Sequence, residues 1–192
     1  MGKPRTSFVQ SFIEPNEGKT NMGILEGKVA LVTGAGQGIG RGIALALSAE
    51  GAAIAVAGRT AGKLDETVGE IRRRGGTAIA IKCDVTDPAD IDATIERTRA
   101  ELGGAHILVN NAQEYCFGML NDIDLDLVDA GWKSGPLATL MFMRGAYPML
   151  RGDGVVINLS SAAAVDADVA GIGIYSATKS AIGAISRAAA VE

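Results

Sequence analysis

The chain has 192 residues, 47% of them hydrophobic and 21% charged, and its formal net charge is −4. This length and composition describe one globular domain with a sizeable core and exclude a disordered chain. The Lys and Arg residues form no dense stripe, which argues against a nucleic-acid partner, and no run reaches the roughly 20 apolar residues that cross a membrane. Cys83 and Cys116 are far apart and form no metal-ligand pattern, so we expect no metal site and a reducing, cytoplasmic compartment.

Residues 1–21 are charged and polar throughout, without the apolar stretch of a secretory signal. We expect them to form a poorly ordered tail, because terminal segments without anchors rarely pack. The segment that begins at Met22 leads directly into the first apolar run. The folded domain is therefore predicted to span residues 22–192.

Apolar and amphipathic segments alternate along this domain. The short apolar runs predict strands at Val29–Thr33, Ala53–Ala57, Ala78–Ile81, Ile107–Val109 and Val155–Leu159. The amphipathic segments predict helices at Gly40–Glu50, Lys63–Arg74, Pro88–Leu102, Leu137–Leu150 and Ile174–Val191. The alternation indicates an α/β fold with a parallel sheet, because strands that are buried on both faces read as continuous apolar runs.

A glycine-rich turn follows the first predicted strand and opens the first predicted helix. Glycine permits a tight turn and lets the backbone approach a pyrophosphate, while the helix N-terminus offers N–H donors and a positive dipole end. The strand–turn–helix context is the one that a dinucleotide site requires. The turn consists of Thr33, Gly34, Ala35, Gly36, Gln37, Gly38, Ile39 and Gly40.

Tyr175 and Lys179 stand four residues apart in the last predicted helix and therefore share one face. A nearby ammonium favours the phenolate, so Lys179 is expected to lower the pKa of Tyr175. A tyrosine with a lowered pKa can act as a general acid or base near neutral pH. The spacing alone is common, but together with the glycine-rich turn it predicts a proton-transfer site.

The spacing Gly34-x-x-x-Gly38-x-Gly40, preceded by Thr33, resembles the short-chain dehydrogenase/reductase family. The resemblance runs from Leu25 to Glu192 and implies a Rossmann-type doubly wound parallel sheet in three α/β/α layers, which binds a dinucleotide. Each further motif follows a predicted strand or lies in the helix after one. These motifs are Cys83-Asp84-Val85, Asn110-Asn111-Ala112, Ser160-Ser161 and Tyr175-x-x-x-Lys179.

The resemblance implies hydride transfer between a nicotinamide cofactor and a small secondary alcohol or carbonyl substrate. Tyr175 would exchange the proton, and Lys179 would lower the pKa of Tyr175 and hold the nicotinamide ribose. Ser161, with Ser160 as the alternative, would donate a hydrogen bond to the substrate oxygen. The implied cofactor-binding residues are Thr33, Gly34, Gly36, Gln37, Gly38, Ile39, Gly40, Arg59, Asp84, Val85, Asn110, Asn111, Ala112, Tyr175 and Lys179.

The choice of cofactor depends on the end of the second predicted strand, which reads Gly58-Arg59-Thr60. An acidic residue there would bind the ribose 2′-OH of NAD, whereas an Arg accommodates the 2′-phosphate of NADP. The sequence therefore favours NADP(H), with NAD(H) as the second possibility. The alternative is that Arg59 is an ordinary solvated loop residue.

Two positions depart from the family pattern. Gln113 stands where the family usually has Gly, so its side chain could alter the turn or reach toward the ribose. Gly135 stands where the family commonly has an Asn that helps to hold a water relay to the Lys. Ser134 is a candidate substitute for that Asn, and Pro136 could shift the start of the following helix.

The chain ends at Glu192, inside the last predicted helix, although the six-strand order of this fold needs another strand after it. We therefore expect a domain that is incomplete at its C-terminal end, with the fifth strand as an exposed edge. Small residues in the last helix suggest a homodimer or homotetramer. The rival interpretations are a dinucleotide-binding protein without turnover and, ranked last, a lyase or isomerase.

Overall fold

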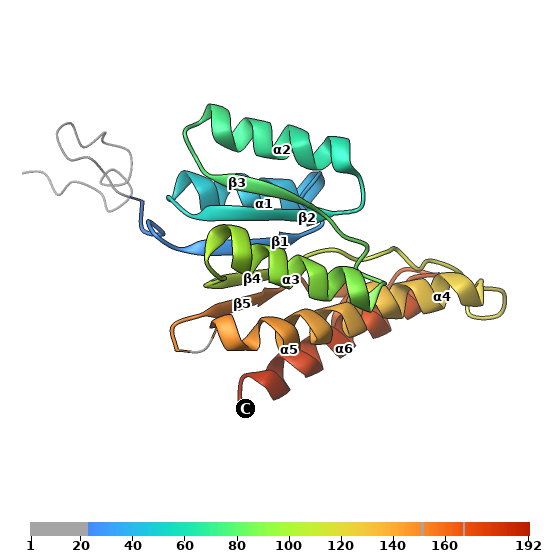
Figure 1. Cartoon of the computed structure of the whole chain (residues 1–192). Coiled ribbons are helices and arrows are strands. Elements are labelled where there is room, and N and C mark those ends of the chain that lie inside the picture. Colours follow the sequence, from blue (N-terminus) through green and yellow to red (C-terminus); the bar gives the residue numbers. More distant parts are fainter. Residues whose placement is uncertain (1–22, 151, 167) are drawn as a thin grey trace, which may run out of the picture.

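The computed structural model describes residues 23–192, except for residues 151 and 167. The expectation of a tail over residues 1–21 concerns a segment that lies outside this range. Within it, helices and strands alternate as the sequence predicts (Figure 1).

The described chain forms one parallel sheet of five strands. The strands are β1 Val29–Thr33, β2 Ala53–Gly58, β3 Ala78–Lys82, β4 Ile107–Asn110 and β5 Val155–Asn158. Their order in the sheet is β3-β2-β1-β4-β5, so the chain moves outward from β1 to β3 and then crosses over to β4. Val32 pairs with Val56 on one side and with Val109 on the other. This order confirms the predicted Rossmann-type sheet and places a topological switch point between β1 and β4, where such folds bind ligands.

Helices cover both faces of the sheet. They are α1 Gly38–Ala49, α2 Ala61–Arg73, α3 Pro88–Leu102, α4 Leu125–Trp132, α5 Ala138–Leu150 and α6 Gly173–Ala189, with a short 3₁₀ helix at Ala162–Ala164. Most bounds lie within two residues of the predicted ones. Helix α4 was not among the predicted helices, although Asp124 caps it by accepting a hydrogen bond from the Asp126 N–H at 2.9 Å.

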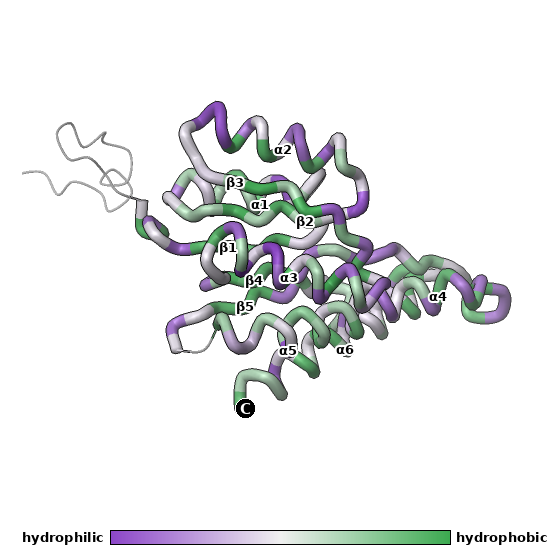
Figure 2. Tube along the Cα trace, in the orientation of Figure 1, coloured by the Kyte–Doolittle hydropathy of each residue, from purple (hydrophilic) through white to green (hydrophobic). Residues whose placement is uncertain are grey.

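Alternate side chains of the inner strands β1, β2 and β4 enter two separate cores. Val32 and Ile54 pack with Leu64 of α2 on one face of the sheet. Leu31 packs with Phe142 of α5 on the other face. The strands consequently carry apolar residues in succession, as the hydropathy colouring shows (Figure 2), which explains why they could be recognised in the sequence.

A wide π-helical turn, η2 Lys133–Leu137, joins α4 to α5 and contains Pro136. A proline has no N–H to donate, and a π turn is one way in which a helix accommodates such an interruption. Regular α5 therefore begins at Ala138, one residue after the predicted start at Leu137. This agrees with the expectation that Pro136 could shift the start of the helix. Ser134, Gly135 and Pro136 are all buried in this turn.

The fifth strand is the outer strand of the sheet beside β4. Its side chains are unusually open for an apolar strand, with Val155 52%, Val156 39% and Ile157 41% exposed. The expectation that the fifth strand is an exposed edge is confirmed for the described residues.

Candidate functional site

The glycine-rich turn between β1 and α1 has the geometry that its glycines allow. Gly34 and Gly38 have φ angles of 66° and 55°, which residues with a side chain rarely adopt. A Cβ on Gly40 would lie 2.4 Å from the Gly34 carbonyl oxygen, so only glycine fits there. Gln37 precedes α1 without capping it through its side chain, among the residues described. The first N–H groups of α1 are therefore left available to an anionic ligand.

Hydrogen bonds fasten this turn to the turn after β4. The buried Thr33 hydroxyl accepts from the N–H groups of Asn111 and Ala112 at 3.0 and 3.1 Å, and it donates to the Val109 carbonyl at 3.3 Å. The Asn111 side-chain amide donates to the Thr33 carbonyl at 2.9 Å. Thr33 and Asn111 thus hold together the two turns that flank the switch point.

A cleft of about 380 Å³ lies at this end of the sheet. Five predicted cofactor residues do not line it, and two of them, Tyr175 and Lys179, lie on α6. Thr33 is buried beneath the turn, Gly40 lies inside α1, and the Asn110 side-chain amide donates to Asn158 at 2.8 Å. The predicted residues that do line it are Gly34, Gly36, Gln37, Gly38, Ile39, Arg59, Asp84, Val85, Asn111 and Ala112.

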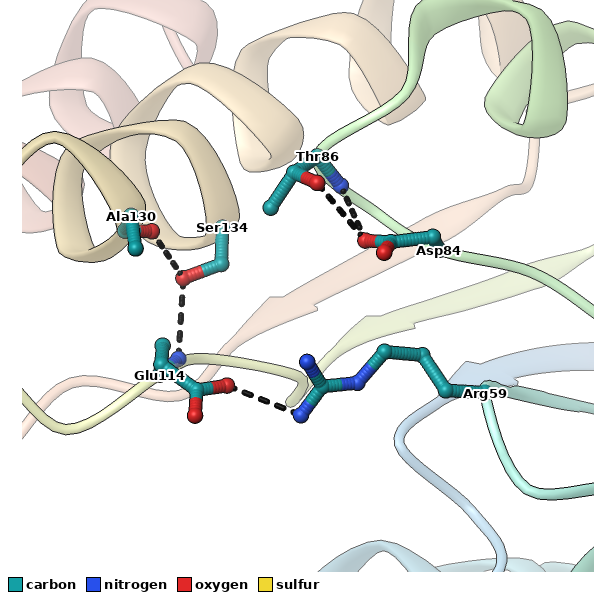
Figure 3. Close-up of polar contacts among 6 residues, drawn as sticks. All are labelled: Arg59, Asp84, Thr86, Glu114, Ala130 and Ser134. Carbon is teal, nitrogen blue, oxygen red and sulfur yellow. Dashed lines mark hydrogen bonds and ion pairs between the residues drawn. The ribbon is translucent and has the colours of Figure 1, made fainter. Parts of the chain in front are cut away.

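Two acidic groups line the same cleft (Figure 3). Glu114 accepts a hydrogen bond from the Arg59 guanidinium at 2.8 Å. Asp84 accepts from the Thr86 N–H and hydroxyl at 2.9 and 2.8 Å, and these bonds lower the pKa of its carboxyl. The cation predicted to meet a 2′-phosphate is therefore paired with a carboxylate. Glu114 was not among the predicted site residues, although it is an acid two residues after the Asn110–Ala112 motif.

Ser134 is fully engaged in backbone contacts. Its hydroxyl accepts from the Glu114 N–H at 2.8 Å and donates to the Ala130 carbonyl at 2.7 Å (Figure 3). The hydroxyl has one hydrogen, and that hydrogen is used within α4 and η2. This arrangement argues against Ser134 as the substitute for the family's Asn.

The predicted proton-transfer residues lie on α6 and just beyond β5. The Lys179 ammonium lies 5.7 Å from the centre of the Tyr175 ring and donates to the Leu159 carbonyl at 2.6 Å. The Ser161 hydroxyl accepts from the Ala163 N–H at 3.2 Å, and its side chain is near enough to Tyr175 to lower the pKa of the phenol. The Ser160 hydroxyl donates instead to the Lys179 carbonyl at 3.3 Å. The geometry favours Ser161 over Ser160 as the partner of Tyr175.

The expected lowering of the Tyr175 pKa is wrong for this structure. Burial raises the pKa of the phenol above its ordinary value, and the nearby Ser161 side chain only partly offsets that effect. Burial also lowers the pKa of Lys179. Both shifts follow from desolvation, which disfavours the charged form of either group. The spacing in the sequence placed the two residues together but could not reveal how much water surrounds them.

An aromatic pair covers Tyr175, and the sequence analysis did not identify it. The Tyr115 and Phe117 rings stack at 5.6 Å, and their centres lie 5.7 and 5.5 Å from the Tyr175 ring. Tyr115 is 65% exposed, so this cover lies at the surface. The Tyr-x-Phe alternation that begins three residues after Ala112 was the available signal.

Across residues 23–150, 152–166 and 168–192, no helix is long and apolar enough to cross a membrane. The same residues contain no cluster of three or more His, Cys, Asp or Glu side chains that could hold a metal ion.

A glycine-rich turn at the switch point of a parallel sheet, with Tyr175 and the buried Lys179 on α6, defines a dinucleotide-binding α/β protein. The model of the short chain dehydrogenase family matches residues 28–192. The chain therefore belongs to the short-chain dehydrogenase family, as the resemblance in the sequence implies.

Individual relatives agree with this assignment. The chain is 39% identical over 181 residues to a 12alpha-hydroxysteroid dehydrogenase from Clostridium sp., and the match covers 89% of this chain and 69% of the relative. A short chain dehydrogenase from Burkholderia cenocepacia in complex with NADP shares 36% identity and a TM-score of 0.80, over 82% of this chain and 65% of that one. L-sorbose reductase from Gluconobacter frateurii, complexed with NADPH and L-sorbose, shares 32% identity and a TM-score of 0.84, over 89% and 65%. The chain thus spans about two thirds of the length of these relatives.

Proposed function

We propose that this chain carries the cofactor-binding and proton-transfer parts of an NADP(H)-preferring oxidoreductase. The reaction is hydride transfer between nicotinamide and a small secondary alcohol or carbonyl. The observation that supports it best is the proximity of Ser161, Tyr175 and Lys179 at the carboxyl end of β5 and the start of α6. Tyr115, which lines the cleft of the glycine-rich turn, packs against the Tyr175 ring and connects this group to the cleft.

Tyr175 is the proton donor and acceptor in this proposal, and Ser161 holds the substrate oxygen beside it. Because the pKa of Tyr175 is raised, its phenol is neutral at physiological pH and can donate a proton. A neutral phenol is the form that carbonyl reduction needs. Lys179 supplies a buried positive charge on the same face of α6. The nicotinamide supplies or removes the hydride when it is bound.

The residues of the cleft fit a dinucleotide phosphate. The N–H groups at the start of α1 and the positive φ of Gly34 and Gly38 provide backbone donors without side chains in the way. Arg59 is the group for the 2′-phosphate, and two of the similar structures hold NADP or NADPH. NAD(H) is the second possibility, since Glu114 already shares the charge of Arg59.

Three further features belong to the proposal. The aromatic rings of Tyr115 and Phe117 beside Tyr175 suit a substrate with apolar surface. Both cysteines are free and buried, which is compatible with a cytoplasmic location. The open side chains of β5 and the small residues of α6 are surfaces through which a homodimer or homotetramer could form.

The test measures binding and turnover separately. NADPH and NADH are titrated by fluorescence, and ketones and secondary alcohols of increasing apolar size are then screened by the change in NADPH absorbance. We expect NADPH binding and ketone reduction, and a loss of at least about 100-fold in rate for Tyr175→Phe. Binding without any turnover would support the rival function, a dinucleotide-binding protein without catalysis. Product formation without net NADPH consumption would support lyase or isomerase chemistry.

A further inference from the structure

The carboxamide of Gln113 links the turn after β4 to α6. Its Nε2 donates to the Thr178 hydroxyl at 2.7 Å. Thr178, which is fully buried, donates in turn to the Tyr175 carbonyl at 2.7 Å. A hydroxyl has one hydrogen, and Thr178 uses it on Tyr175. The group that faces Thr178 must therefore be a donor, which fixes the orientation of the Gln113 amide.

Gly135 makes room for that carboxamide. A Cβ on Gly135 would lie 2.9 Å from the Gln113 Cδ, 3.0 Å from its Nε2 and 3.1 Å from its Oε1. Contacts this short with three atoms of one amide mean that a side chain at position 135 would displace the Gln113 amide from its place against Thr178. Gly135 is not among the glycines with a positive φ. Its backbone would thus tolerate other residues, and the approach of Gln113 is what requires glycine.

The remaining atom of the amide has no partner within the described chain. Gln113 Oε1 is buried and accepts no hydrogen bond from any described residue. A buried acceptor that has lost water and gained no donor destabilises the fold. Such an atom in a native structure calls for an explanation, and a binding or catalytic role is one. Gln113 also lines the proposed cofactor cleft.

We propose that Gln113 and Gly135 form a coupled pair that positions the proton-transfer helix. The Gln113 amide holds α6 through Thr178, and its Oε1 accepts a hydrogen bond from a water or hydroxyl group of the reacting complex. Gly135 is the position that must stay without a side chain for this to happen. Gln113 is a positioning residue, since it acts on Tyr175 through Thr178. The inference rests on the proposed oxidoreductase function for its kinetic part only.

The packing part is tested by a thermal-unfolding cycle of Gln113→Gly, Gly135→Asn and the double variant. Gly135→Asn alone forces a side chain against the Gln113 amide, and Gln113→Gly alone empties the space and leaves Thr178 without its donor. The double variant exchanges the positions of the amide and the glycine, so we expect it to be more stable than the sum of the single changes predicts. Additive changes in melting temperature would show that Gln113 and Gly135 are not coupled and would overturn the proposal.

The positioning part is tested by kinetics well below the melting temperature of each variant. Gln113→Gly should lower kcat by about 10-fold to 100-fold while the KM for NADPH stays within about threefold, because misplaced reacting groups slow the chemical step. In a Thr178→Val background the same change should have little further effect, and the double exchange should recover most of kcat. An unchanged kcat in Gln113→Gly, or an effect on KM alone, would show that Gln113 does not position Tyr175.

The two parts separate this proposal from the proposed function. If the unaltered protein transfers no hydride, the oxidoreductase function is wrong, and the unfolding cycle still decides whether Gln113 and Gly135 are coupled. If the unaltered protein is active and the stability changes in the unfolding cycle are additive, the proposed coupling of Gln113 and Gly135 is wrong. The oxidoreductase function then stands.

Discussion

Arg59 and Glu114 form an ion pair of 2.8 Å between the end of β2 and the turn after β4, with β1 lying between these two strands in the sheet. Both side chains line the cleft and are largely solvated, Arg59 at 62% and Glu114 at 41% exposure. The pair therefore crosses the end of the sheet at which the glycine-rich turn lies. A 2′-phosphate and the Glu114 carboxylate would compete for the same guanidinium.

The first prediction concerns this competition. Glu114→Gln should tighten NADPH binding by about threefold to tenfold, because an exposed ion pair is weak and its removal frees Arg59 for the phosphate. NADH has no 2′-phosphate, so its affinity should stay within about twofold. Fluorescence titration of both cofactors measures the two constants.

Arg59→Asp serves as the opposing variant. It should weaken NADPH binding by about tenfold or more and shift the preference toward NADH, since the charged hydrogen bond to the phosphate is lost. Unchanged relative affinities for the two cofactors in both variants would show that Arg59 is a solvated loop residue.

The second prediction concerns the pH at which Tyr175 ionises in the cofactor-free protein. Burial raises the pKa of its phenol, so Tyr175 should ionise above the ordinary value for tyrosine of about 10. The difference in ultraviolet absorbance between the unaltered protein and Tyr175→Phe isolates this one phenol.

The same shift fixes the sign of a stability effect. The folded state holds the proton of Tyr175 more tightly than the unfolded state does, so this contribution to stability is complete below the unfolded pKa. It is lost as the pH rises through the folded pKa. Tyr175→Phe should therefore lose less stability than the unaltered protein on going to strongly alkaline pH. A phenol that titrates well below the ordinary value would contradict both expectations.

Local signals explain most of what the sequence could predict. The strands of the sheet are continuous apolar runs, and the turn after β1 consists of glycines in a fixed spacing. Both are properties of residues that are adjacent in the sequence, so the fold and the position of the cleft could be predicted from them. The missed helix α4 also had a local signal, the capping residue Asp124, and could have been predicted.

The features of the site that escaped prediction are contacts between distant segments. Glu114, in the turn after β4, meets Arg59 at the end of β2, and the amide of Gln113 lies against Gly135 of η2. The pKa of Tyr175 depends on burial, and Tyr115 and Phe117, from a loop on another part of the chain, pack against its ring. The i, i+4 spacing of Tyr175 and Lys179 is visible in one helix, whereas the desolvation of both groups requires the packed structure.

The third prediction concerns the two thiols. Burial raises the pKa of Cys83 to about 11 and also raises the pKa of Cys116. The thiolate is the nucleophile, so both residues should react very slowly with iodoacetamide at pH 8 in the folded protein. In denaturant both should react at the rate of a free thiol. Mass spectrometry of the alkylated protein counts the modified residues, and rapid modification of the folded protein would mean that these side chains are accessible.

The fourth prediction tests the glycine-rich turn with two neighbouring alanine substitutions in α1. Gly40→Ala places a Cβ 2.4 Å from the Gly34 carbonyl oxygen and 2.5 Å from the Asn111 amide, so the turn must move. We expect a loss of cofactor affinity of at least about tenfold, because the turn brings the backbone close to the bound pyrophosphate. A destabilisation of about 1–3 kcal/mol should accompany it.

Gly42→Ala is the matched control for that prediction. A Cβ on Gly42 would meet no atom of the described chain within 4 Å, and the residue is exposed on the same helix. Alanine favours a helix over glycine by up to about 1 kcal/mol, so this variant should be as stable as the unaltered protein or slightly more stable, with unchanged cofactor binding. Thermal unfolding and cofactor titration of both variants make the comparison. Equal effects at positions 40 and 42 would mean that helix propensity, rather than the close approach of the turn to α1, explains the glycine at position 40.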